Sequence, residues 1–265
     1  SYPQMVRLAG GKPVFLNSSA EDGFKINIQD LKSKISPKTK FIIINSPNNP
    51  TGRVMPKEEL LQIAELVREN KNINILSDEI YELILKKEFK HLSLASLATD
   101  LKERIFIING FAKGWAMTGW RVGYLVGQKD VIKASSALQS QSTSNVCSFV
   151  QRGALEALKI NREFFLEINS HYDLRREVLY KGLKNIEGLF IYPPNGAFYA
   201  FPRLPNNSMT SVEFCKRILN DYGLVVVPGK PFGDDQCIRI SCASSKEKIL
   251  DGLTRLEKGI LNYYF

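Results

Sequence analysis

Three groups of polar residues follow short apolar runs in this 265-residue chain, and the last group carries the most chemistry. Residues 111–124 combine glycine and tryptophan with one lysine, Lys113, and one arginine, Arg121. A lysine in a glycine-bounded, aromatic turn can lose its proton through desolvation and nearby positive charge, and the neutral amine can then form a Schiff base. The guanidinium of Arg121 offers a planar fork for a phosphate. Taken alone, the segment fits a surface lysine and an arginine stacked on tryptophan equally well.

The second group, residues 77–81, places an acid at the end of an apolar run and a phenol three residues later. Asp78 and Tyr81 are expected to face one pocket. A buried acid paired with a ring nitrogen stays ionised and keeps that nitrogen protonated. Asp78 alone fits the cap of a following helix just as well.

The first group, residues 45–52, holds two prolines that fix the backbone and asparagines that offer hydrogen-bond donors. By itself this pattern is typical of a tight loop. Its position matters more than its composition, since ligands of open α/β sheets bind beyond the carboxyl ends of the strands.

The apolar runs that precede these groups predict the strands that must position them. Residues 41–44, 73–76, 105–108 and 122–126 are nearly continuously apolar, as in strands that are covered on both faces. Between the first two runs, residues 56–70 repeat apolar side chains at helical spacing. This order predicts a β-α-β unit and a largely parallel sheet.

The last third of the chain has a different pattern. A long helical stretch from about residue 145 to residue 183, with a break near Asn161, is expected to bridge two domains, divided as 1–168 and 169–265. Strands are predicted at 189–192, 197–201, 224–227 and 237–241, and helices at 211–222 and 244–261. Ser244 and Glu247 have the spacing of a capping box for the last helix. The second domain is therefore expected to be a smaller α+β layer.

Composition narrows the class of protein. The chain is 44% hydrophobic and 24% charged, as expected for a compact globular domain. Its net charge of +9 favours anionic ligands, but the charges are spread along the chain, so nucleic acid is not implied. The four cysteines lack paired spacing and the only histidines are His91 and His171, so we expect neither a metal site nor a disulfide framework, and a reducing cytoplasm fits best. The chain contains no apolar run of about 18 residues, so the sequence predicts no membrane-spanning helix.

The three polar groups, in this order, resemble the fold-type I, class I aminotransferases, which use pyridoxal 5'-phosphate (PLP). Residues 48–52 resemble the N-P-T-G loop of that family, residues 77–81 its D-E-x-Y strand end, and residues 111–124 its lysine segment, with A-M-T-G-W-R-x-G-Y intact. Residues 1–13 resemble the S-Y-P-x-x-V-R-L-A-G-G-x-P stretch of the bacterial aspartate and prephenate aminotransferase subgroup. The resemblance covers essentially the whole chain, and it implies that about a third of the family's length, upstream of Ser1, is absent.

The resemblance implies a fold and a cofactor site. The fold would be a mostly parallel sheet with helices on both faces, in a PLP-binding large domain that is truncated at its amino terminus, plus the small carboxyl-terminal domain. Lys113 would hold PLP as a Schiff base and Asp78 would pair with the pyridine nitrogen. Asn49 and Tyr81 would hydrogen-bond the ring oxygen, and Arg121 would bind the phosphate. The family also has a cis peptide at the matching loop proline, which would be Asn49-Pro50 here.

A second arginine is the candidate for binding substrate. Alternation in residues 237–241 places Arg239 opposite Ile238 and Ile240, on the wetter face of its strand. By pattern alone, an exposed strand arginine fits equally well. The segment resembles the family's R-x-S strand, which binds the substrate carboxylate together with the loop asparagine, here Asn49, and residues 195–199 resemble the family's G-A-F-Y strand.

The function implied is amino transfer between an amino acid and a 2-oxo acid, with aspartate and 2-oxoglutarate first and prephenate or aromatic amino acids next. Lys113 would then act as the general base. A homodimer is implied for the full-length protein, and weak or absent turnover for residues 1–265, since part of the cofactor site is missing. The alternatives are a carbon-sulfur lyase, an alanine or aromatic aminotransferase, a noncatalytic remnant, or the sensor domain of a transcription regulator. In the last case a winged DNA-binding domain would precede Ser1.

Overall fold

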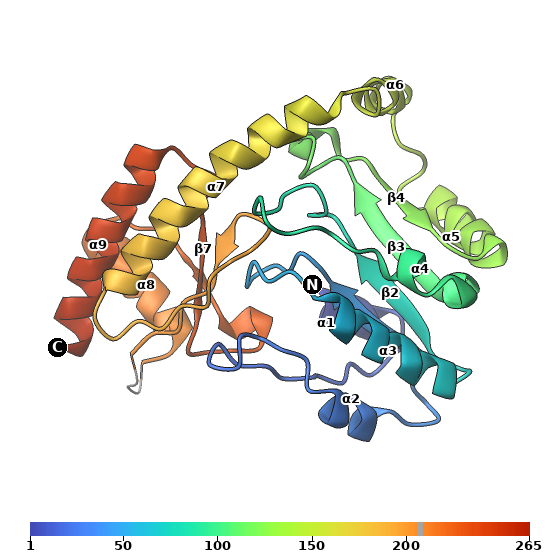
Figure 1. The fold of residues 1–265 in the computed structure, drawn as a ribbon, viewed down its shortest axis with the longest axis horizontal. Coiled ribbons are helices and arrows are strands. Elements are labelled where there is room, and N and C mark those ends of the chain that lie inside the picture. The colour runs from blue at the N-terminus through green and yellow to red at the C-terminus, as the bar shows by residue number, and fades with distance from the viewer. Residues whose placement is uncertain (206–208) are drawn as a thin grey trace.

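The chain folds around two β-sheets that are joined by one long helix. The structure is a computed structural model and describes residues 1–205 and 209–265. Figure 1 shows the larger sheet on the right, the smaller one on the left, and helix α7 (Arg162–Asn185) along the upper edge between them. The predicted fold class is confirmed.

The larger sheet has the strand order β1-β2-β3-β4, with β1 (Phe41–Asn45), β2 (Asn74–Asp78), β3 (Ile105–Gly110) and β4 (Gly123–Val126). The first three strands are parallel, as predicted, and their carboxyl ends lie at the same edge. Strand β4 runs antiparallel to β3. The connection between β3 and β4 is the loop that carries Lys113, and it contains no α-helix. A connection without a crossover helix joins antiparallel strands, so β4 runs opposite to β3.

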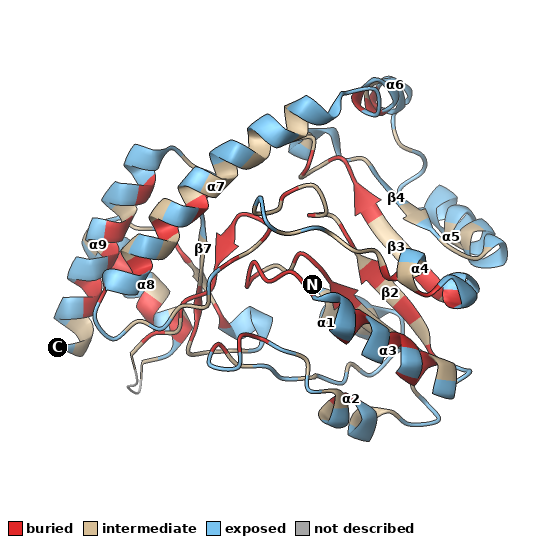
Figure 2. Ribbon diagram, viewed as in Figure 1, coloured by how far each residue is buried: buried red, intermediate tan, exposed pale blue. Residues whose placement is uncertain are grey.

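One face of this sheet forms a closed core. Helix α3 (Lys57–Glu69) lays an apolar face on it, and alternate strand residues, Ile44, Ile75 and Ile105, are buried beneath α3 and the segment around Leu94. On the opposite face Phe106 is buried, but Leu76 and Ile108 are only partly buried. Burial is therefore concentrated on the side of α3 (Figure 2).

Strand β4 and the two helices after it are much less buried. Helix α5 (Lys129–Ser142), which the sequence pattern did not predict, has no buried residue. Helix α6 (Ser148–Ala157) turns Ala154 and Ala157 against Phe111 and Trp115 of the lysine segment. The break before α7 falls as predicted, because the Asn161 side chain accepts a hydrogen bond from Phe164 N and caps the new helix.

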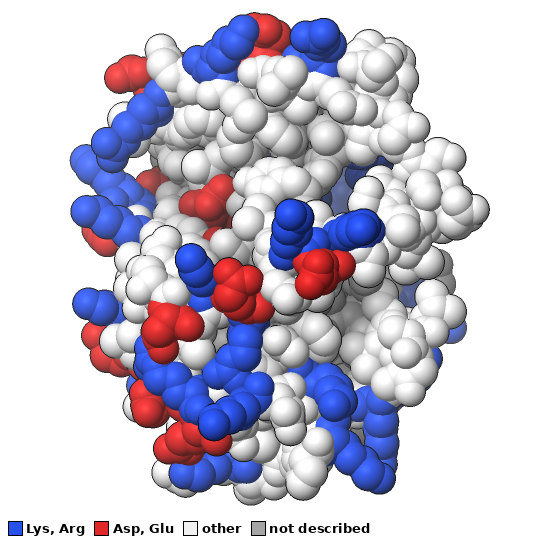
Figure 3. Space-filling view, turned by 90° about the vertical axis from the view of Figure 1, so that its right-hand side faces the viewer, with Lys and Arg blue, Asp and Glu red and all other residues white. Residues whose placement is uncertain are grey.

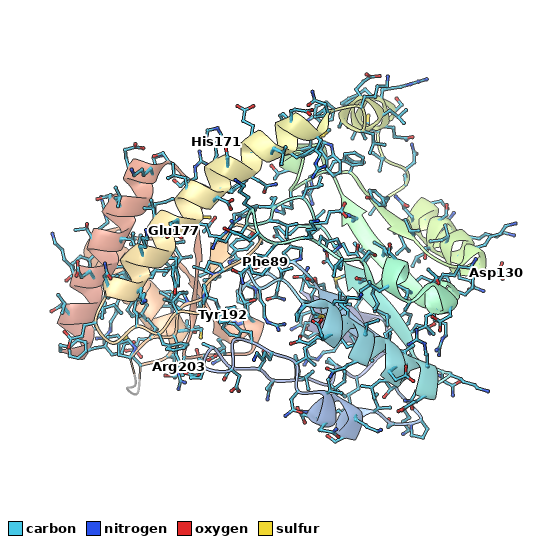
Figure 4. The ribbon with its side chains drawn as sticks, viewed as in Figure 1. Phe89, Asp130, His171, Glu177, Tyr192 and Arg203 are labelled. Carbon is cyan, nitrogen blue, oxygen red and sulfur yellow. The ribbon has the colours of Figure 1, made fainter. Side chains whose placement is uncertain are left out.

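The smaller sheet has the order β5-β7-β6 and is antiparallel throughout, with β5 (Tyr199–Ala200), β6 (Val227–Pro228) and β7 (Ile238–Ser241). Helices α7, α8 (Ser211–Tyr222) and α9 (Lys246–Tyr264) cover it and bury Phe214, Ile218 and Leu256. Both C-terminal helices were predicted, but Ser245 rather than Ser244 caps α9, since its side chain accepts from Lys248 N. Figure 4 shows His171 and Glu177 along α7, at the upper edge of the molecule.

The predicted strand at 189–192 is wrong. Phe190 forms only an isolated bridge with Arg203, and prolines at 193 and 194 cannot donate ladder hydrogen bonds. Strand β6 likewise begins only at Val227, so most of the predicted strand at 224–227 is irregular.

Backbone hydrogen bonds join the two parts of the fold. Gly52 O accepts from the amides of Asn195 and Gly196, at 2.8 and 2.7 Å, and Ile84 O accepts from Ala197 N at 2.9 Å. Gly52 has a φ of 70°, and an added Cβ would lie 2.7 Å from Tyr199 O. Only glycine permits this approach of the loop to the smaller sheet.

Further short elements are α1 (Tyr2–Leu8), α2 (Ile28–Lys34), α4 (Leu94–Leu97) and the 3-10 turns η1 (Thr99–Arg104), η2 (Thr118–Trp120) and η3 (Lys230–Phe232). Among the described residues, no helix combines the length and apolar character needed to cross a membrane. On the face formed by the right-hand side of Figure 1, basic and acidic side chains are intermixed rather than gathered into one basic patch (Figure 3).

Candidate active site

The carboxyl ends of the three parallel strands bring the predicted polar groups to one edge of the sheet. Asn45 is paired in register with Asp78, and Asp78 with Ile108. The loops that leave these strands carry Asn49, Tyr81 and Lys113. Segments far apart in the sequence thus meet where an open α/β sheet binds its ligands.

Asp78 is held by hydrogen bonds to both of its carboxylate oxygens. Oδ1 accepts from Ile80 N at 3.2 Å, and Oδ2 accepts from the phenol of Tyr2 at 2.5 Å. The main chain at Asp78 is held as well, because its carbonyl accepts from Asn45 Nδ2 at 3.0 Å and from Ser46 N at 3.2 Å. Asp78 therefore does not cap a helix of its own, the alternative that the sequence left open, since a turn follows it.

Tyr81 is almost fully buried, with 3% of its surface exposed, and its hydroxyl lies 3.2 Å from that of Tyr199. Burial, followed by the hydrogen bond to Tyr199, raises the pKa of the Tyr81 phenol well above its ordinary value. Tyr81 thus keeps its proton at neutral pH and can act as a hydrogen-bond donor.

Lys113 lies half-buried against aromatic rings. Its Nζ is 5.9 Å from the ring centre of Tyr81 and 5.7 Å from that of Phe198. Burial, and then the positive charges of Arg121 and Arg239, lower the pKa of the Lys113 ammonium below its ordinary value. A lowered pKa increases the fraction of neutral, nucleophilic amine at any given pH.

Arg121 lies at the outer rim of the site. Its backbone is left-handed, with a φ of 53°, and its Nη1 donates to Thr118 O at 2.9 Å. The residue is exposed, in contrast to the other predicted site residues. A guanidinium has further donors beyond this bond, and the exposure of Arg121 leaves it open to an anion.

Asn49 and Arg239 meet although 190 positions separate them. Arg239 Nη1 donates to Asn49 Oδ1 at 2.9 Å. The guanidinium carbon of Arg239 also lies 4.5 Å from the ring centre of Tyr199 and 5.1 Å from that of Phe232. Arg239 is therefore not the exposed strand arginine that the pattern alone allowed, since aromatic rings and Asn49 hold it at the site.

The cis peptide expected in the asparagine loop lies elsewhere. Asn49-Pro50 is trans, and the cis bond is Ser46-Pro47. Asn48 closes the turn at residues 48–52, because its Oδ1 accepts from Thr51 N and its carbonyl accepts from Gly52 N. Asn49 is positioned separately, because its backbone N–H donates a hydrogen bond to Asn45 Oδ1 at 2.9 Å.

A buried polar network lies behind Asp78. Glu79 accepts from Ser77 and Ser93 and contacts His91 Nε2 at 2.9 Å. Burial acts to raise the pKa of Glu79, but the hydrogen bond and charge of His91, with those of the two serines, outweigh it and hold the pKa below its ordinary value. The network joins the segment after β2 to residues 91–93 and thereby stiffens the main chain that carries Asp78.

Two site residues escaped the sequence reasoning. Tyr2 lies in the S-Y-P stretch and Tyr199 in the G-A-F-Y stretch, so both were noted as parts of motifs without a role. The sequence around each tyrosine contains no pattern that identifies the partner of its hydroxyl group. Only the tertiary structure shows that Tyr2 contacts Asp78 and that Tyr199 contacts Tyr81.

The fold and the site together define a class of protein. A mostly parallel sheet presents a lysine of lowered pKa, an oriented carboxylate and a buried phenol at one edge, and a smaller sheet adds an arginine. The family model described as aminotransferase class I and II matches residues 1–256. The chain therefore belongs to this family.

Individual relatives agree with the family match. The chain is 41% identical to a probable aspartate/prephenate aminotransferase of Rickettsia felis, over 97% of this chain and 66% of the relative. It is also 41% identical to an aspartate aminotransferase of Bacillus subtilis, over 97% of this chain and 67% of the relative. The chain thus spans about two thirds of the length of these proteins.

Solved structures give the same answer for the fold. An aromatic aminotransferase from Pyrococcus horikoshii superimposes with a TM-score of 0.93 at 38% identity, over 98% of this chain and 70% of the other. An aspartate aminotransferase from Thermus thermophilus with maleate gives 0.91 at 39% identity, over 98% of this chain and 67% of the other.

Proposed function

We propose that this chain forms the larger part of a PLP-dependent aminotransferase that moves an amino group between L-aspartate and 2-oxoglutarate. The observation that carries the proposal is the placement of Lys113, whose amine lies half-buried between aromatic rings at the sheet edge where Asp78 also lies. The names of the relatives support the reaction class and favour aspartate. They do not favour a lyase, a remnant or a regulator.

The residues present fit PLP. When bound, PLP supplies an aldehyde that condenses with primary amines and a ring that accepts electrons. Lys113 offers the amine, and Asp78 offers a carboxylate whose two oxygens are already oriented. Arg121 offers free guanidinium donors at the rim for the phosphate.

Two further side chains would hold the ring oxygen of PLP. Tyr81 keeps its proton, so it can donate, and the Asn49 amide lies in the neighbouring loop. Because Tyr81 is bonded to Tyr199 and Asn49 to Arg239, both are positioned before any ligand arrives. Preorganised donors cost little reorganisation when charge develops on the ring oxygen.

Arg239 would bind the α-carboxylate of the amino acid. A guanidinium that rests on Tyr199 and keeps donors beyond the bond to Asn49 can form two parallel hydrogen bonds to a carboxylate. When its amine is not joined to PLP, Lys113 would be able to take the α-proton of the bound amino acid and to return it at a neighbouring carbon. Its pKa lies below the ordinary lysine value, which raises the fraction of neutral amine that can act as a base.

The wider setting follows from the same proposal. We place the boundary between the PLP-binding part and the small domain at residues 168 and 169, within α7, and we expect a homodimer in the full-length protein. The cytoplasm is the proposed compartment, in keeping with four free cysteines. Prephenate and aromatic amino acids are the next substrates to test, since one relative carries prephenate in its name and one solved neighbour is an aromatic aminotransferase.

Borohydride reduction in the presence of PLP tests the lysine assignment. We expect PLP to be fixed on the peptide that contains Lys113 and on no peptide of the Lys113→Ala variant. The matched control is Lys230→Ala, which removes a lysine whose side chain is 65% exposed, and it should leave the labelling unchanged. A stable label on another lysine would refute the assignment. Keto-acid product profiles then separate aspartate from aromatic substrates, and we expect weak turnover by residues 1–265 alone.

A further inference from the structure

We infer that Tyr2 is a positioning residue for Asp78, which it holds in the orientation that receives the ring nitrogen of PLP. The inference rests on the proposed function. Tyr2 begins α1, a helix that buries none of its residues, and its phenol reaches across 76 positions to Asp78 Oδ2 at 2.5 Å. This side chain therefore links a helix without fully buried residues to the candidate active site.

The contact fixes the carboxylate rather than merely touching it. Ile80 N occupies one lone pair of Oδ1 and the Tyr2 hydroxyl occupies one of Oδ2, so rotation of the carboxylate about Cβ–Cγ would break both hydrogen bonds. Each oxygen keeps a second lone pair for a further donor. A protonated ring nitrogen is such a donor, and a carboxylate that is already oriented binds it without ordering a side chain.

Tyr2 is also in the correct protonation state for this task. Burial, and then the charge and hydrogen bond of Asp78, raise the pKa of the Tyr2 phenol above its ordinary value. A raised pKa means that the phenol keeps its proton through the neutral range and into the alkaline one. Tyr2 thus acts as a donor to Asp78 wherever the carboxylate is ionised.

The contact itself can be tested without PLP. In the folded chain, NMR of tyrosine labelled at Cζ should show that Tyr2 stays protonated at a pH where exposed tyrosines titrate, with Tyr2→Phe identifying its signal. Asp78→Asn removes the negative charge and should shift the Tyr2 titration to lower pH. Titration of Tyr2 together with exposed tyrosines in both proteins would overturn the inference.

The positioning role can be tested by the affinity of the full-length protein for PLP, measured by the visible absorbance of bound PLP. Tyr2→Phe should weaken binding roughly tenfold, the effect expected for loss of a hydrogen bond to a charged group. Tyr263→Phe is the matched control, because Tyr263 donates to Asp221 at 2.6 Å in the same kind of contact at an exposed place, and it should change nothing.

A double-mutant cycle separates positioning from a general structural role. If Tyr2 acts through Asp78, adding Tyr2→Phe to Asp78→Asn should cost no further affinity. A full tenfold loss in that background would show that Tyr2 only stabilises the fold, and would overturn the inference. Failure of the full-length protein to bind PLP would instead overturn the proposed function, and the tyrosine titration would still decide whether Tyr2 and Asp78 interact.

Discussion

Helices α3 and α5 both follow strands of the larger sheet, yet they differ sharply in burial (Figure 2). Helix α3 buries residues such as Leu60, Ile63 and Val67. Helix α5 buries none, and β4 beside it is largely exposed. The sheet therefore has a firmly packed region around β1 to β3 and a loosely covered region from β4 onward.

The candidate active site includes residues from both the firmly packed region and the loosely covered region. Asn49 and Asp78 are held by the packed region and Tyr81 by the core of the smaller sheet, whereas Arg121 lies two residues before the exposed strand β4. Lys113 lies between them, in a loop whose Trp115 donates to Ala157 O of α6 at 3.0 Å. We infer that the groups proposed to bind the PLP ring are fixed more firmly than the group proposed to bind its phosphate.

We expect the largest loss of stability from breaking the buried ion pair of the packed region. Arg53 and Glu59 form two hydrogen bonds, at 2.9 and 2.5 Å, with both side chains shielded from water. Glu59→Gln leaves the Arg53 charge buried without its partner and should lower the free energy of unfolding by about 3–5 kcal/mol. Urea denaturation measures this loss.

The control for this experiment is an exposed ion pair on α3, the helix that also carries Glu59. Glu65 contacts Arg68 at 3.0 Å and its side chain is 62% exposed. Glu65→Gln should cost less than about 1 kcal/mol, since surface pairs contribute little. Equal losses for the two variants would show that the packed region does not exclude water as the structure indicates.

A somewhat smaller difference is expected between single apolar truncations of the two helices. Ile63→Ala in α3, where the side chain is fully buried, should cost about 3 kcal/mol through lost burial and the cavity left behind. Leu138→Ala in α5, where the residue is 71% exposed, should stay within about 0.5 kcal/mol. If Leu138→Ala cost as much as Ile63→Ala, a surface that the described residues leave exposed would have to be covered in solution.

The smallest effect concerns charge at the boundary of the two regions. Arg121→Gln removes a positive charge that lowers the pKa of Lys113, so that pKa should rise. At a fixed pH below the midpoint, fewer molecules would carry the neutral amine, and the pH profile of Lys113 modification by an amine reagent would move to higher pH. Lys129→Gln, in exposed α5, is the control. An unchanged profile in Arg121→Gln would mean that Arg121 does not contribute, and that burial and Arg239 lower the pKa of Lys113 without it.

Much of this site followed from the sequence because its residues lie directly after strands. The apolar runs at 41–44, 73–76 and 105–108 correspond closely to β1, β2 and β3, and parallel pairing then brings the following loops together. The contact of Arg239 with Asn49 could be expected from resemblance only, since no local pattern relates residues 190 positions apart.

Other features depended on tertiary contacts that periodicity does not encode. The Tyr2 contact requires α1 to pack near the end of β2, and nothing in the spacing of residues 1–11 specifies that position. The direction of β4 depends on how the Lys113 loop packs. The segment at 189–192 has strand-like composition but lacks a partner for more than one bridge.

The hydrogen bonds from Asn195 and Gly196 to Gly52 have a consequence for motion. They tie the carboxyl-terminal part to the asparagine loop at a point that tolerates no added side-chain atom. Two more backbone bonds, from Ala197 N to Ile84 O and from Lys86 N to Asn195 O, tie the same three residues to the chain after β2. Residues 195–197 are therefore anchored on both sides, and any movement of the smaller sheet that keeps these bonds must be taken up by the chain outside them.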